Sequence, residues 1–209
     1  MDGRPHGPTI GILALQGAVR EHRRAVERLG APVLPVKRVE ELALIDGLII
    51  PGGESTTIGK LMQAYGLIDP IRRRAAEGMA VFGTCAGLIL LAKSTVESSG
   101  NLLGLMDIKA RRNAFGRQVD SCETEIAVEA LREPPFPAVF IRAPWIEEIG
   151  SGVLGLAEYD GRTVLAEQGR FLACAFHPEL TEDLRLHGYF IETVMNREVV
   201  CPAIQNGQR

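Results

Sequence analysis

The chain has 209 residues, of which 46% are hydrophobic and 23% charged, and its formal net charge at pH 7 is −3. This composition is typical of globular proteins and excludes disordered and fibrous chains, as well as proteins that bind nucleic acid through a broad basic surface. The length favours a single domain spanning residues 1–209, with a core at about residues 10–196 and mobile ends.

Cysteine content and hydrophobic runs indicate the compartment. No apolar run approaches the ~18 residues of a membrane-spanning helix, and the N-terminal residues are polar. The cysteines are too few for a disulfide scaffold and form no CxxC pair of the kind that binds structural zinc. They are Cys85, Cys122, Cys174 and Cys201. We therefore expect a cytoplasmic protein with no membrane contact and no metal site.

Short apolar runs alternate with helical patterns in the first half of the chain. Strands are expected at 9–15, 33–36, 47–50 and 79–82, and helices at 18–30, 55–65 and 68–77. Strands that alternate with helices form βαβ units, so this half predicts a mostly parallel sheet with helices on both faces.

The second half has a different pattern, with closely spaced apolar runs followed by one amphipathic segment. Strands are expected at 123–128, 138–141, 153–158, 163–167 and 171–176, and a closing helix at 184–196. The fold class is therefore α/β with a β-rich second half.

A nucleophile candidate lies where the fourth predicted strand turns into a helix. Residues 83–87 read G-x-C-x-G, the cysteine counterpart of the G-x-S-x-G nucleophile elbow. At such a turn Cys85 would lie at a helix N-terminus, where the dipole favours the thiolate, and the N–H of Ala86 would face an oxyanion. The alternative is a buried cysteine in a glycine-rich turn.

Two further residues complete a nucleophilic arrangement. His177 follows an apolar strand, at the carboxyl end where open α/β sheets place their sites, and Glu179 lies two residues later. His177 could act as a base toward Cys85, with Glu179 orienting the imidazole. His22 and His187 fall on apolar helix faces and are expected to be structural.

A glycine-containing loop, Pro51-Gly52-Gly53-Glu54-Ser55, follows the third predicted strand. Hydrolase-like sites take a second oxyanion donor from a loop in this position, and the two glycines allow close backbone approach. Glu54 is either an acid favoured by the helix dipole or a group that binds a substrate ammonium.

Together these motifs resemble the class I, triad-type glutamine amidotransferases, and most closely the glutaminase subunits of pyridoxal 5′-phosphate synthases. The matching segments are LQGAVREH (15–22), PGGESTT (51–57), FGTCAGLILLAK (82–93), RNAFGRQVDSCE (112–123), FIRAP (140–144) and FHPELTED (176–183). The resemblance covers residues from about 10 to 194 and implies the flavodoxin-like fold of that family.

The resemblance also assigns roles to residues. It implies a Cys85–His177–Glu179 triad, and with the turn chemistry above it points to Gly53 and Ala86 as oxyanion-hole residues. The glutamine-binding residues it implies are Gly53, Glu54, Ser55, Arg112, Ile141 and Arg142. A zwitterionic substrate needs a cation for its carboxylate, which Arg112 could supply. Without the resemblance, Arg112 would be read as one of several exposed basic residues.

The implied activity is hydrolysis of L-glutamine to glutamate and ammonia through a Cys85 thioester, with no cofactor. The implied partner is a (β/α)₈-barrel synthase subunit that accepts the ammonia for pyridoxal 5′-phosphate (vitamin B6) synthesis and contacts the 16–22 segment. The alternatives are a glutaminase serving a different synthase, a non-catalytic flavodoxin-like binding module, and a cysteine hydrolase that does not use glutamine.

Overall fold

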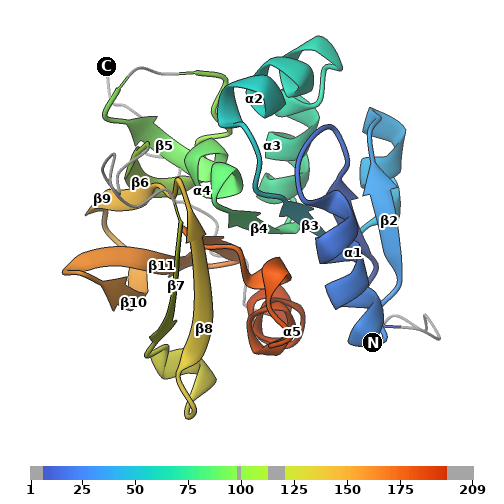
Figure 1. The fold of residues 1–209 in the computed structure, drawn as a ribbon. Helices are drawn as coiled ribbons and strands as arrows, with labels where there is room; N and C mark the ends of the chain where they lie inside the picture. The colour runs from blue at the N-terminus through green and yellow to red at the C-terminus, as the bar shows by residue number, and fades with distance from the viewer. Residues whose placement is uncertain (1–6, 98–99, 113–120, 197–209) are drawn as a thin grey trace.

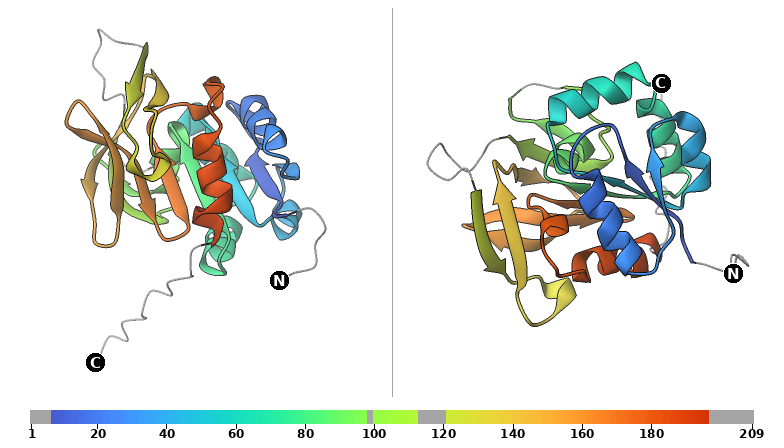
Figure 2. Two further views of the ribbon diagram at one scale, coloured as in Figure 1. Left: turned by 90° about the horizontal axis from the view of Figure 1, so that it is seen from below. Right: turned by 45° about the vertical axis from the view of Figure 1, so that its right-hand side comes forward.

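A sheet of ten strands runs through the computed structural model, which describes residues 7–97, 100–112 and 121–196 (Figures 1 and 2). Five neighbouring strands run parallel to one another. In sheet order they are β2 (Val33–Val36), β1 (Ile10–Leu13), β3 (Gly47–Ile50), β4 (Ala80–Thr84) and β12 (Phe171–Cys174). Every residue of β1, β3 and β4 is buried, because helices cover both faces of this half.

The sheet continues beyond β12 with strands that pair mainly antiparallel. They are β11 (Arg162–Gln168), β9 (Trp145–Ile149), β6 (Met106–Arg111) and β5 (Ala92–Thr95), with β10 (Leu154–Tyr159) paired to β11. A separate antiparallel pair consists of β7 (Ser121–Ile126) and β8 (Phe136–Ile141). Burial alternates along β6 and β8, as expected where one face of a strand meets the core and the other does not.

Helices lie on both faces of the parallel half. On one face α1 (Val19–Arg28) and α5 (Arg185–Glu192) lie side by side, and α2 (Ser55–Ala64) and α3 (Ile68–Ala76) lie on the other (Figure 2, right). Helix α4 (Ala86–Leu91) is short and contacts α2. The 3₁₀ helices are η1 (Val39–Leu44), η2 (Glu129–Leu131), η3 (Pro178–Leu180) and η4 (Val194–Asn196). Among the described residues, no helix combines the length and apolar character needed to cross a bilayer.

The predicted α/β class, with a mostly parallel sheet and a β-rich second half, is confirmed. Strands β5, β6 and β9 were not predicted. The closing helix predicted for 184–196 was too long: α5 ends at Glu192, where the β-branched Thr193 leaves helical geometry before η4. Strand β12 ends at Cys174 rather than 176. The ends predicted to be mobile lie mostly outside the described residues.

Two glycines allow close backbone packing between β3, β4 and α4. A Cβ on Gly87 would lie 2.2 Å from the carbonyl oxygen of Ile50 in β3, and a Cβ on Gly83 would lie 2.5 Å from the carbonyl of Gly87. Such separations are far below van der Waals contact, so neither position accepts a side chain without backbone movement. The turn that carries Cys85 is therefore held between β3 and β4.

We predict that Gly87→Ala lowers the free energy of unfolding by about 1–3 kcal/mol, because the added methyl group overlaps the backbone of β3. Urea denaturation monitored by circular dichroism measures the change. Gly188→Ala in α5 is the matched control: its Cβ would meet only Leu29, at 3.9 Å, so replacing a helical glycine should stabilise by roughly 0.5–1 kcal/mol. Equal effects of the two substitutions would contradict the packing argument.

Candidate active site

Cys85 occupies a sharp turn between β4 and α4. Its backbone has φ 49° and ψ −100°, a conformation that L-residues other than glycine rarely adopt. The turn is held by a hydrogen bond from the Cys85 N–H to the carbonyl of Cys174, at 2.8 Å, and the residue is only 6% exposed. This is the geometry of a nucleophile elbow, which presents the thiol at the carboxyl end of the sheet.

His177 and Glu179 lie just beyond the carboxyl end of β12, the strand next to β4. The Nδ1 atom of His177 is 2.8 Å from Oε1 of Glu179, whose side chain is fully buried. The His177 N–H donates to the carbonyl of Val139 in β8, at 2.8 Å, which fixes the backbone. With Nδ1 occupied by the carboxylate, Nε2 of the ring remains for Cys85.

The environment of His177 favours its charged form. Burial by itself would lower the pKa of His177, but the interactions with Cys85 and then with Glu179 outweigh it and raise the pKa to about 10. An imidazolium beside a cysteine sulfur favours the thiolate, and the thiolate–imidazolium pair is the activated form of cysteine nucleophiles.

The glycine loop brings the third predicted motif to the same place. A Cβ on Gly52 would lie 2.4 Å from Cε1 of His177 and 3.4 Å from Cβ of Cys85, so the loop backbone packs directly against both side chains. The loop follows β3, and β3, β4 and β12 are neighbours in the sheet. The three sequence motifs therefore converge because the carboxyl ends of three adjacent parallel strands converge.

The orientation of this loop is set by residues 16–18, which follow β1. Oε1 of Gln16 accepts a hydrogen bond from the Glu54 N–H at 2.8 Å, and the Ala18 N–H donates to the Gly52 carbonyl at 3.0 Å. Since the C=O and N–H of a trans peptide point in opposite directions, the Gly53 N–H points away from Ala18. Sequence reasoning did not identify Gln16 as a site residue, although its place after the first parallel strand could have suggested it.

Glu54 and Arg112 lie at the start of α2. The Glu54 carboxylate caps the helix by accepting from the N–H groups of Thr56 and Thr57, at 3.0 and 2.7 Å. The Thr57 hydroxyl, followed by these N–H groups, outweighs desolvation and lowers the pKa of Glu54 to about 2. Arg112 donates to Oγ1 of Thr56 at 3.0 Å and lies 3.4 Å from Glu54. Glu54 thus has the helix-start role that the sequence offered as one alternative.

A cavity of about 280 Å³ lies beside this cluster and is lined by Ser55, Thr56 and Arg112 together with residues of α4. Ser55 is 7% exposed. Ile141 and Arg142 lie at the carboxyl end of β8, just beyond the Val139 carbonyl that holds His177, and Arg142 has a positive φ of 43°.

The strand end that carries Arg112 is fixed by Trp145, a residue the sequence left without a role. Arg111 donates to both carboxylate oxygens of Glu147, at 2.8 and 3.1 Å, and Nε1 of Trp145 donates to the same carboxylate at 2.7 Å. The guanidinium of Arg162 lies 4.6 Å from the Trp145 ring centroid, within the range of a cation–π contact.

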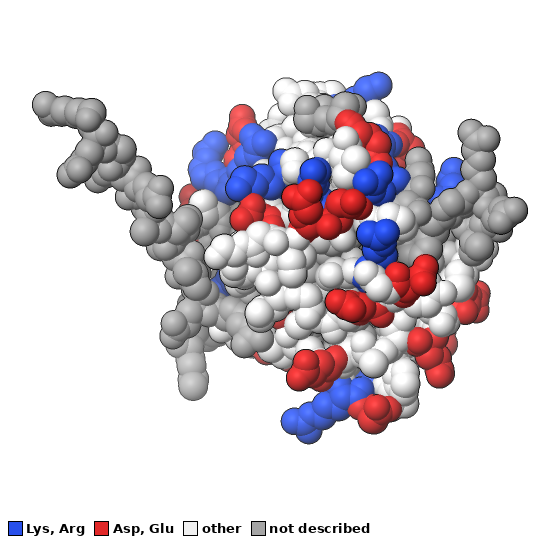
Figure 3. Space-filling view, turned by 90° about the vertical axis from the view of Figure 1, so that its left-hand side faces the viewer, with Lys and Arg blue, Asp and Glu red and all other residues white. Residues whose placement is uncertain are grey.

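Acidic and basic side chains are mixed on the face shown in Figure 3.

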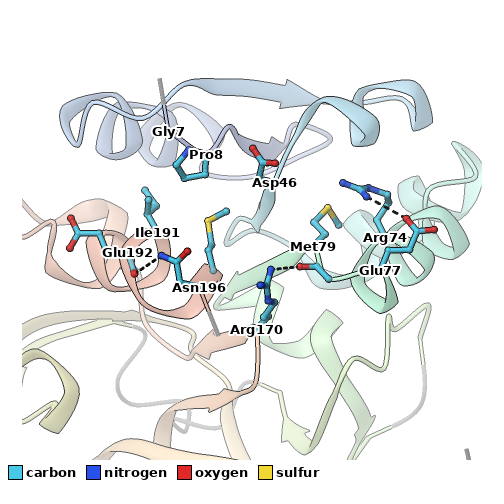
Figure 4. Close-up of a pocket in the computed structure, with 12 residues that line it drawn as sticks. Gly7, Pro8, Asp46, Arg74, Glu77, Met79, Arg170, Ile191, Glu192 and Asn196 are labelled. Atoms are coloured by element: carbon cyan, nitrogen blue, oxygen red, sulfur yellow. Dashed lines mark hydrogen bonds and ion pairs between the residues drawn. The ribbon is translucent and has the colours of Figure 1, made fainter. Parts of the chain in front are cut away.

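A second cavity, of about 690 Å³, lies at the opposite edge of the sheet (Figure 4). Its lining includes residues that precede β3, β4 and β12, such as Asp46, Met79 and Arg170. Ligands of open α/β sheets bind at the carboxyl ends of the strands, so this cavity is at the wrong edge for the Cys85 chemistry. Within the described ranges, no three His, Cys, Asp or Glu side chains gather in a way that could hold a metal ion.

Residues 12–196 match the SNO glutamine amidotransferase family. Two relatives named "Pyridoxal 5′-phosphate synthase subunit PdxT" illustrate the similarity. The protein from Herpetosiphon aurantiacus is 57% identical over 187 residues, covering 88% of this chain and 98% of the relative. The protein from Carboxydothermus hydrogenoformans is 54% identical over 185 residues, covering 88% of this chain and 97% of the relative.

Solved structures agree with these relatives. A crystal structure described as a glutamine amidotransferase superposes with a TM-score of 0.85 at 51% identity, covering 88% of this chain and 98% of its own. The PurLQS structure from Thermotoga maritima has a TM-score of 0.67 at 15% identity, covering 89% of this chain and 98% of that one, and shares the fold.

We predict that Cys85→Ala lowers the pKa of His177 from about 10 toward the ordinary 6.5, because the interaction with Cys85 that raises it is lost. NMR titration of the imidazole measures this pKa, and Cys122→Ala on β7 is the control. By linkage, the raised pKa stabilises the folded state fully below pH 6.5, and this contribution is lost as the pH rises toward 10. An unchanged pKa in Cys85→Ala would show that Cys85 does not pair with His177.

Proposed function

The chain belongs to the SNO glutamine amidotransferase family and is a glutamine-hydrolysing subunit, and we propose that Cys85, His177 and Glu179 carry out the hydrolysis. The observation that carries this proposal is the position of Gly52, whose backbone packs against both Cys85 and His177. It joins the three motifs into one centre at the carboxyl ends of β3, β4 and β12.

In the first half-reaction, the Cys85 thiolate attacks the side-chain carbonyl carbon of glutamine. The carbonyl oxygen becomes an oxyanion, and the imidazolium of His177 gives its Nε2 proton to the leaving nitrogen. The C–N bond breaks, ammonia leaves, and a thioester remains on Cys85. The pKa of about 10 supports this role, since it keeps His177 protonated before the attack.

In the second half-reaction, neutral His177 removes a proton from water as the water oxygen attacks the thioester. The C–S bond then breaks, Cys85 returns to the thiolate, and glutamate leaves. Glu179 holds the ring through Nδ1 in both steps, so Nε2 stays directed toward the reacting atoms.

Oxyanion stabilisation is assigned to backbone N–H groups of Ala86 and Gly53. Ala86 begins α4 directly after the nucleophile, the usual place for one donor. The Gly53 N–H is the second donor, and its direction is supported by the bond between the Gly52 carbonyl and Ala18.

Recognition of glutamine is assigned to the surroundings of the α2 N-terminus. Arg112 would bind the substrate carboxylate, with Gly53, Glu54 and Ser55 forming the loop against which the amino acid lies. Glu54 caps α2 and lies 3.4 Å from Arg112, so it places the guanidinium beside the proposed substrate carboxylate site. Ile141 and Arg142, at the end of β8, are assigned further contacts with the substrate on the basis of the family resemblance.

The ammonia serves a synthase subunit. The relatives are named as subunits of pyridoxal 5′-phosphate synthase, so the chain acts with such a partner, and we assign it a (β/α)₈-barrel synthase in the cytoplasm. Direct transfer is favourable because free ammonia is mostly protonated in neutral water and then no longer nucleophilic. Residues 10–196 act as one glutaminase domain, which is supported by a hydrophobic core that is continuous across both halves of the sheet.

We predict that Cys85→Ala abolishes glutamate release, because no thioester can form, and that the synthase subunit strongly raises the rate of the unsubstituted protein. A coupled glutamate dehydrogenase assay, run with and without the synthase, measures both effects. Cys122→Ala is the control for loss of a thiol. Near-normal turnover by Cys85→Ala would exclude the mechanism, whereas an unchanged rate on adding the synthase would exclude this partner.

We predict that Arg112→Ala raises KM for glutamine about 10- to 100-fold, the effect expected from losing a hydrogen bond between charged groups worth ~1.5–3 kcal/mol. The kcat should change much less, since Arg112 is remote from the reacting atoms. Lys109→Ala is the control, because Lys109 pairs with Glu148 on the neighbouring strand. A KM equal to that of the control would remove Arg112 from the binding site.

A further inference from the structure

Two buried histidines lie behind the carboxylate of Glu179, on the side away from His177. His22 comes from α1 and His187 from α5, and neither has any exposed surface. Nδ1 of His22 is 2.9 Å from Nε2 of His187, while Nε2 of His22 is 3.0 Å from Oγ1 of Thr84 and 3.4 Å from Oε2 of Glu179. The mechanism described above uses neither histidine.

Both rings are neutral at physiological pH. Burial, followed by the neighbouring His22, lowers the pKa of His187 to about 3. Burial also dominates for His22 and lowers its pKa, against the opposing effect of Glu179. Each ring therefore carries one proton, and in the short contact between them one nitrogen must donate and the other accept.

The hydrogen-bond partners determine where the two protons lie. Among the described residues, two buried side-chain atoms here have no hydrogen-bond partner, Nδ1 of His187 and Oε2 of Glu179. A buried N–H without an acceptor is costly, so the proton of His187 lies on Nε2 and is donated to Nδ1 of His22. The proton of His22 is then on Nε2, facing Thr84 and Glu179. The opposite arrangement would bury an unpaired N–H and turn a nitrogen lone pair toward the carboxylate.

We propose that His22 is a positioning residue for the triad carboxylate, with His187 holding its Nε2–H toward Oε2 of Glu179. This rests on the proposed role of Glu179 and extends it. The carboxylate then has one histidine at each oxygen, His177 at Oε1 and His22 at Oε2. His177 bonds Oε1 at 2.8 Å and the Nε2–H of His22 is a donor 3.4 Å from the otherwise unpartnered Oε2, so rotation of the carboxylate away from His177 would lose both contacts.

The titratable groups around Glu179 are consistent with this arrangement. Burial would raise the pKa of Glu179, whereas the charge that a protonated His22 would supply, followed by the hydrogen bond and charge of His177, lowers it below its ordinary value. The groups that face Glu179 and His22 are Glu21 on α1, Cys85 after β4, Cys174 on β12, His177 before η3 and His187 on α5. With His22 neutral, its Nε2–H still lies 3.4 Å from Oε2, so loss of this N–H dipole should make Glu179 easier to protonate.

The first test reads the tautomers of the full chain directly. Long-range ¹H–¹⁵N correlation spectra of ¹⁵N-labelled protein distinguish Nε2–H from Nδ1–H imidazoles, and His22→Gln and His187→Gln assign the signals. We expect both histidines to be neutral Nε2–H tautomers at pH 7.5 and above. A proton on Nδ1 of His22 would overturn the proposal, whatever the activity of the protein.

The second test separates positioning from stability, with glutamate release measured in the presence of the synthase. We expect His22→Leu to lower kcat about 10- to 100-fold, the scale of effect seen when a catalytic group is misplaced. KM should stay within about twofold, because the glutamine-binding residues are untouched. The acid limb of the kcat/KM profile should move to higher pH, since Glu179 protonates more readily. His22→Gln, whose amide can still donate to Glu179, should recover most of kcat.

Phe190→Leu is the matched control for a buried substitution on α5, because the Phe190 ring packs at a tilt against Phe82 and has no polar atom to take part in the hydrogen bonds of His22, His187 or Glu179. It should lower the melting temperature without moving the pH profile. A His22→Leu protein that keeps the kcat and pH profile of this control would overturn the proposal. An equal loss of kcat in His22→Leu and His22→Gln would also overturn the proposal. If the unsubstituted protein does not hydrolyse glutamine, the proposed function is refuted. The tautomer test then decides alone whether His22 directs its Nε2–H toward Glu179.

Discussion

The strained turn at Cys85 depends on the close approach of three backbone segments, namely strand β3, helix α4 and the loop that contains Gly52. Strand β3 passes so near α4 that only glycine fits at position 87, and the Gly52 loop presses against His177 in the same way. These contacts hold the positive φ of Cys85, which an isolated chain would not keep. Because the contacts are between backbones, the position of the thiol is fixed by the sheet itself rather than by flexible side chains.

A buried charge is the second requirement of the site. The fully buried carboxylate of Glu179 would be costly if it were unpaired, and its two histidine neighbours offset that cost. The same carboxylate, together with Cys85, keeps His177 charged. Helices α1 and α5 thus have a role beyond covering the sheet, since the proposed pair His22 and His187 connects them to the chemistry.

The sequence predicted the parallel half well and the second half less completely. Strands β1, β3 and β4 are continuous apolar runs, which only a sheet covered on both faces produces. Strand β6 alternates charged with apolar residues, whereas β9 carries two adjacent acids, Glu147 and Glu148, and these charges pair across the two strands, as in Arg111 with Glu147. Such strands become evident only when their partners are known, because cross-strand pairing is a non-local interaction.

For the site, the sequence alone selected the proposed nucleophile, its histidine and the glycine loop, because a strained turn and close backbone approach demand particular residues at fixed spacing. Gly52, Gly83 and Gly87 are three such positions near Cys85. Only the tertiary structure decided that Glu54 caps α2, that Gln16 orients the loop and that His22 faces Glu179. These roles depend on which elements meet, and segments 165 residues apart, such as those of His22 and His187, come into contact only when the sheet brings their helices to one face.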